Sequence, residues 1–250
     1  MLGLGSVAIY STYHYIINML KKITSKLSGS MTAIVGNILV KDKERMHEVY
    51  KEFNGMLFFV AIAICVPLIL SINGFIDIFY EGRIEKSLLI AISSSLILFM
   101  YIIKQNTILF VSAGGLYKET KHCAMVDTCV NLVLSLTLVH IIGMSGVLFA
   151  TAISVFIAEY ILKTIVVHKH IFNISASGYF INNIKFFIIF VLDLIGGFYI
   201  VNKFTIAHLS TWFILYIIFT LVNAIVIFIV FKIFRETKFI KRIKMLKRRA

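Results

Sequence analysis

The chain has 250 residues, of which 60% are hydrophobic and only 15% are charged. A soluble domain carries about 25% charged residues, and the mean hydropathy of this chain is +0.94. This composition excludes water as the main solvent of the chain. The formal net charge of +13 would suit nucleic acid in a soluble protein, but the basic residues gather in the tail and in short gaps between apolar segments. That placement is typical of a membrane protein.

Apolar segments long enough to cross a bilayer follow one another along the chain. They predict an all-α integral membrane protein with about seven transmembrane helices, over approximately 2–40, 55–76, 87–113, 123–141, 146–168, 183–201 and 209–234.

The first segment, about 50 Å long at the rise of an α-helix, is too long for one straight span. We expect one long, bent helix, because two helices would place Lys21, Lys22 and Lys26 in an outside turn, against the positive-inside rule. Pro67 is expected to kink the second span.

Seven spans assign the gaps between them to alternate sides of the membrane. Eighteen of the 25 Lys and Arg then fall on one side, Lys163 counted among them, three fall on the other side, and four lie within spans. The positive-inside rule places the basic side in the cytoplasm, together with the C-terminus. Residues 235–250 mix basic and apolar side chains and predict an amphipathic cytoplasmic tail. The predicted N-terminus lies outside, but the first residues contain no obvious signal that would carry it across the membrane. We therefore expect an upstream segment to be missing.

The first predicted helix carries a polar face. Its polar and small residues recur at alternating spacings of four and three, which places them on one side of a helix: Ser11, Tyr15, Asn18, Lys22, Ser25, Gly29, Thr32 and Gly36. Such a stripe should face water or another helix rather than lipid tails. Lys22 and Lys26 put cations on or near it, which suits an anionic headgroup; the alternative is that these lysines only snorkel to the interface.

Other ionisable residues lie inside the predicted spans and are functional candidates for that reason. Lys104, in the third span, is a second candidate for an anionic ligand, unless it is simply a lysine near a helix end. Glu159 and Asp193 are candidate coupling-ion sites. Alternatively, these two carboxylates and Asp127 pair with cations or face the cytoplasmic interface.

Several patterns indicate helix packing, and the absence of others argues against an enzyme. Gly146, Ala150, Ser154 and Ala158 recur every four residues, which lets membrane helices approach closely. The three cysteines, Cys65, Cys123 and Cys129, have no C-x-x-C spacing and are expected to be packing residues rather than metal ligands. The sequence lacks metalloprotease, serine-hydrolase and nucleotide-binding motifs, and its outer loops are short. We therefore expect no enzymatic activity and no cofactor.

Five strings of the sequence together resemble the polysaccharide biosynthesis (O-antigen, capsule) flippase family, within the multidrug/oligosaccharidyl-lipid/polysaccharide exporter superfamily. In chain order they are 7–11, 29–37, 114–118, 131–139 and 143–148. The last two predicted helices match the family only as apolar spans.

The resemblance implies the second lobe of a two-lobe flippase, which moves polyprenyl-pyrophosphate-linked oligosaccharide across the bacterial cytoplasmic membrane by alternating access. Compared with this pattern, we expect the first lobe and the helix before Val7 to be missing from the chain. The expected partners are the lipid-linked oligosaccharide, membrane lipids, and a missing N-terminal lobe or other polysaccharide assembly proteins, with no nucleic acid.

The expected substrate contacts are Tyr15, Asn18, Lys22, Lys26 and Lys104, with the lysines attracting the pyrophosphate. One alternative is a cation-coupled multidrug-type exporter of the same superfamily, which needs a carboxylate in the cavity. Another alternative is a half that does not transport.

Overall fold

The computed structural model describes residues 4–29, 31–32, 35–37, 43–81, 87–201 and 208–234. Every element within these residues is a helix, as predicted: α1 (Leu4–Gly29), α3 (Lys43–Phe79), α4 (Leu88–Ala113), α5 (Tyr117–Ile142), α6 (Met144–Val155), η1 (Phe156–Leu162), α7 (Lys163–Val167), η2 (His168–Phe172), α8 (Ser177–Val201) and α9 (Leu209–Ile233). η1 and η2 are π-helical, and the stretch from α6 to η2 forms one long helix. The predicted tail, 235–250, lies outside the described residues.

Six helices of the described part are long and apolar enough to cross a membrane, which gives the chain the character of a multi-pass membrane protein. They are Arg45–Phe79, Leu88–Ala113, Tyr117–Ile142, Met144–Phe172, Ser177–Tyr199 and Leu209–Ile233. The sequence predicts seven. The helix that is not among the six is α1, whose polar face makes it less apolar than the others. α1 ends at Gly29, and several residues needed to follow one bent helix to position 40 lie outside the described residues.

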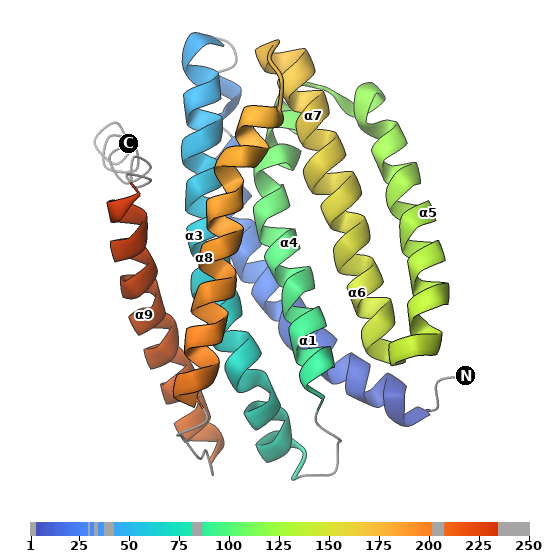
Figure 1. The fold of residues 1–250 in the computed structure, drawn as a ribbon, viewed down its shortest axis with the longest axis vertical. Coiled ribbons are helices and arrows are strands. Elements are labelled where there is room, and N and C mark those ends of the chain that lie inside the picture. Colours follow the sequence, from blue (N-terminus) through green and yellow to red (C-terminus); the bar gives the residue numbers. More distant parts are fainter. Residues whose placement is uncertain are drawn as a thin grey trace.

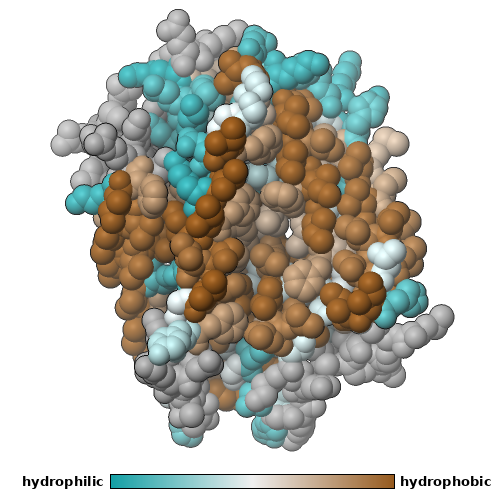
Figure 2. Space-filling view, viewed as in Figure 1, coloured by the Kyte–Doolittle hydropathy of each residue, from teal (hydrophilic) through white to brown (hydrophobic). Residues whose placement is uncertain are grey.

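The bundle is built around α3 and α4, which pack against each other. α8 and α9 pack on α3, α1 and α6 pack on α4, and α5 packs mainly on α6. Figure 1 shows α9 and α5 at opposite edges of the bundle, with α1 crossing behind α4. The α4–α5 turn, the α7–α8 connection and the end of α9 lie at the same end of the bundle. Figure 2 shows a broad hydrophobic band across the middle of this face, with hydrophilic residues gathered at that end.

α3 lies at the centre of the core, and most of its apolar stretch is buried. Its buried side chains include Phe58, whose ring stacks on Phe186 of α8 with centroids 4.8 Å apart. Cys65 of α3 and Cys123 of α5 are buried, as expected of packing residues, but Cys129 is exposed and contradicts that expectation.

The α5–α6 hairpin shows the close approach predicted from its small residues. Gly143 joins the two helices with φ of 62°, a left-handed conformation that favours glycine. A Cβ atom on Gly146 would lie 2.3 Å from the carbonyl oxygen of Leu138, so only glycine fits there. Ala150 and Ala158 are fully buried along the same stripe.

A buried polar network links α3 to η1 and α8. The amide of Asn54 donates to Asn183 Oδ1 at 2.8 Å and accepts from the Tyr179 hydroxyl at 2.7 Å. The amide of Asn183 in turn donates to the Tyr160 hydroxyl at 2.8 Å. We call these four residues the buried polar network. It satisfies its polar atoms internally, as an apolar environment requires.

Candidate functional site

The polar stripe of α1 faces away from the core of the bundle. Tyr13, Ile17 and Thr24, on the opposite side of the helix, are buried. The hydroxyl of Tyr13 donates to Asn73 Oδ1 of α3, which helps to fix the rotation of α1 about its axis. The side chains of Tyr15, Lys22 and the other described residues of the stripe are exposed or half-buried. The residues that helical periodicity placed on one face therefore lie on one side of α1, and that side is open.

A pocket of about 350 Å³ lies where this face meets α4. We call it the α1 pocket, and its lining comprises Tyr15, Asn18, Met19, Lys21, Lys22, Ser25 and Tyr101. Three of the residues predicted to contact substrate, Tyr15, Asn18 and Lys22, are thus brought together. Lys26 is exposed one turn further along α1 and does not line the pocket.

Tyr101 of α4 connects the pocket to Lys104. The Lys21 ammonium lies 5.4 Å from the centroid of the Tyr101 ring, and the Lys104 ammonium lies 5.9 Å from it. Both distances are within the range of attraction between a cation and an aromatic face. Lys104 therefore borders the pocket beside Tyr101 without lining it. Three cations, those of Lys21, Lys22 and Lys104, stand in or next to one small space.

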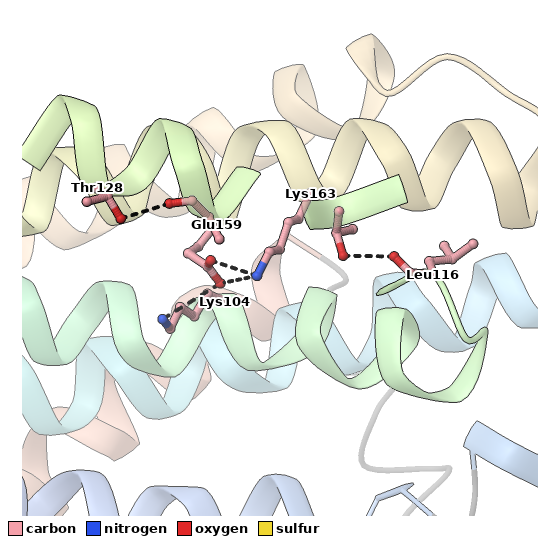
Figure 3. Close-up of polar contacts among 7 residues, drawn as sticks. Lys104, Leu116, Thr128, Glu159 and Lys163 are labelled. Atoms are coloured by element: carbon pink, nitrogen blue, oxygen red, sulfur yellow. Dashed lines mark hydrogen bonds and ion pairs between the residues drawn. The ribbon is translucent and has the colours of Figure 1, made fainter. Parts of the chain in front are cut away.

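Behind Lys104, the carboxylate of Glu159 is held between two lysines (Figure 3). The Lys163 ammonium lies 2.6 and 2.7 Å from its two oxygens, whereas the Lys104 ammonium lies 3.8 Å from the nearer one. Glu159 is only 8% exposed, so its charge requires such partners. Glu159 is an ion-pair residue here, which agrees with pairing rather than with an open coupling site. Lys163, counted in the sequence with the cytoplasmic loops, lies instead inside the bundle.

The structure does not bring Asp193 to the α1 pocket. Its side chain lines a second, apolar space between α3, α8 and α9, and the two spaces share no lining residue. Asp193 is therefore not the carboxylate beside the polar stripe that the exporter alternative requires. Asp127 of α5 interacts electrostatically with Lys104.

Three residues of this region were not assigned to the site from the sequence: Lys21, Tyr101 and Lys163. Lys21 adjoins Lys22 but lies beside the stripe, so helical periodicity gave no reason to choose it. Lys21 is placed at the site by its contact with the Tyr101 ring on another helix. Lys163 is placed there by its ion pair with Glu159, one turn earlier on the same long helix. An i, i+4 spacing of opposite charges was the one local signal for the second pair.

Comparison of the chain with protein-family models, with curated proteins and with solved structures gives no match. The residues and geometry of the site are therefore the evidence for function.

Proposed function

We propose that the chain is a flippase component that moves polyprenyl-pyrophosphate-linked oligosaccharide across the bacterial cytoplasmic membrane, for the synthesis of a surface polysaccharide such as O-antigen or capsule. The observation that carries this proposal is the α1 pocket. It gathers Lys21 and Lys22 with hydroxyl and amide groups on the only long described helix that is not apolar enough to span a membrane.

The chemistry of the pocket suits a pyrophosphate joined to a sugar. Lysine ammonium groups bind phosphate oxygens as compact point charges. Asn18, Tyr15 and Ser25 offer hydrogen bonds to sugar hydroxyls, and the ring of Tyr101 offers an apolar surface. Lys104 adds a third cation, since its 3.8 Å separation from Glu159 is too long for a tight ion pair and leaves its ammonium able to turn toward a phosphate.

In this proposal the polar stripe forms one wall of a wet chamber, and the polyprenyl tail stays in the bilayer. The opposite wall comes from a first lobe or from another protein of polysaccharide assembly, which would cover the stripe that this chain leaves open. The basic end of the bundle and the C-terminus face the cytoplasm. Placed in the bilayer without this cover, the cationic face of α1 would meet lipid tails at a cost of several kcal/mol.

The test measures binding of a polyprenyl pyrophosphate to the full chain in zwitterionic nanodiscs. The Lys21→Ala/Lys22→Ala double variant should lose about ten- to hundredfold in affinity, as expected when charge-assisted contacts are removed. Expressed together with the first lobe or partner protein, the wild type should complement a bacterial strain that lacks its flippase, and the double variant should fail to do so. Lys26→Ala, on the same helix but outside the pocket, is the matched control. Unchanged affinity and complementation in the double variant, at normal expression, would reject the assignment.

A further inference from the structure

A second cavity, of about 500 Å³, lies between α3, α8 and α9. We call it the lateral groove. Apart from Asp193 and Asn223, every residue that lines it is apolar, including Pro67 and Leu70 of α3 and Val226 of α9. Its volume is within the range of sites that bind drug-sized molecules.

The groove opens on the outer surface of the bundle. Leu192 of α8 and Val222 and Val226 of α9 line it and are exposed. α8 and α9 are among the helices apolar enough to span a membrane, so this surface meets lipid. A ligand would therefore reach the groove from within the bilayer, which requires it to be lipophilic.

Asp193 places a carboxylate in this apolar setting. Its Oδ2 atom is buried and has no hydrogen-bond partner among the described residues. The Asn223 side chain interacts with the carboxylate, and its amide also points to the carbonyl oxygen of Ile62 at 3.4 Å. Among the described residues that line the groove, no other is ionisable. A carboxylate shielded from water is costly to ionise without a positive partner, and the lining supplies none.

We propose that the lateral groove binds a lipophilic organic cation, whose charge lies beside the Asp193 carboxylate and whose apolar groups pack between α3, α8 and α9. A lipid acyl chain would fill the same space but would leave the carboxylate without a counter-ion. The site is independent of the α1 pocket because no residue lines both.

Binding of tetraphenylphosphonium to the full chain in nanodiscs tests the charge requirement. Asp193→Asn preserves the shape of the side chain and should weaken binding about ten- to hundredfold, the loss expected for one partly shielded ion pair. Glu119→Gln removes an exposed carboxylate of α5 and should leave affinity unchanged. Triphenylphosphine oxide, a neutral probe of similar bulk, should bind at least about tenfold more weakly than the cation.

Gly196→Leu tests the location of the site. A Cβ on Gly196 meets no atom within 4 Å, so the new side chain extends into the groove without a clash and should abolish binding. Gly178→Leu, at an equally open position of α8 outside the groove, is the matched control and should bind normally. Equal affinity of the wild type and Asp193→Asn, or of the cation and the neutral probe, would overturn the proposal. If Asp193→Asn does not fold, equal binding by the two leucine variants would overturn it.

Discussion

Polar side chains occur in two contrasting settings in this bundle. In the buried polar network, Asn54 and Asn183 each donate one hydrogen bond and accept another, all within the protein. In the α1 pocket, Lys22 and Tyr15 are exposed, Tyr15 to 69% of its surface. The contrast shows that a polar residue in a membrane helix does not by itself mark a site. Groups that are satisfied internally hold helices together, whereas groups left open are available to a ligand.

Like the buried polar network, the ion pair of Glu159 is satisfied within the protein. Breaking it should give the largest change in stability. Lys163→Ala leaves a buried carboxylate with only the distant Lys104, so the free energy of unfolding should fall by about 3 kcal/mol. Denaturant unfolding in detergent measures this change. Glu159→Gln combined with Lys163→Met removes both charges and should recover most of the loss. A single variant as stable as the wild type would show that Glu159 does not depend on Lys163.

The buried polar network provides a second, smaller test. Asn183→Leu removes its bonds with Asn54 and Tyr160 and leaves polar atoms unsatisfied, so stability should fall by about 1–2 kcal/mol. Asn182→Leu changes the exposed neighbour on the same helix and should shift stability by less than about 0.5 kcal/mol. The two variants are compared by thermal unfolding in the same detergent. Equal losses would mean that burial of the amide does not matter.

The α1 pocket should give the smallest effect on stability. Lys22→Ala and Asn18→Ala change open side chains, so each should alter the free energy of unfolding by less than about 0.5 kcal/mol. The same variants are expected to weaken binding of a polyprenyl pyrophosphate in nanodiscs. A loss of stability as large as that of Asn183→Leu would show that these side chains hold helices together, as the buried polar network does.

Much of the fold could be predicted because long apolar runs report directly on membrane helices. The predicted span over 87–113 begins one residue before α4 and ends at the same residue. α3, by contrast, begins at Lys43, twelve residues before its predicted span. Hydropathy detects only the part of a helix that suits the bilayer, and the charged stretch from Lys43 to Glu52 continues the same helix beyond it.

The arrangement of the candidate site could be predicted only where it depends on one helix. Helical spacing identified the face that carries Tyr15, Asn18 and Lys22. Contacts between helices could not be predicted from the sequence, because the rotation of each helix against its neighbours is set by tertiary packing. For that reason the approach of Lys21 to Tyr101 and the separation of Asp193 from the polar stripe emerged only in three dimensions.

The π-helical turns of η1 and η2 have a consequence for how one long helix meets its neighbours. Their hydrogen bonds span five residues instead of four, so each wide turn accommodates an additional residue and changes the direction in which later side chains point. Before η1, Gly146 lies against Leu138 of α5. After it, Thr164 reaches the hydroxyl of Tyr50 on α3, 3.4 Å away. The π-helical turns thus set the direction in which Thr164 points, and deleting one residue from η1 would rotate Thr164 away from Tyr50.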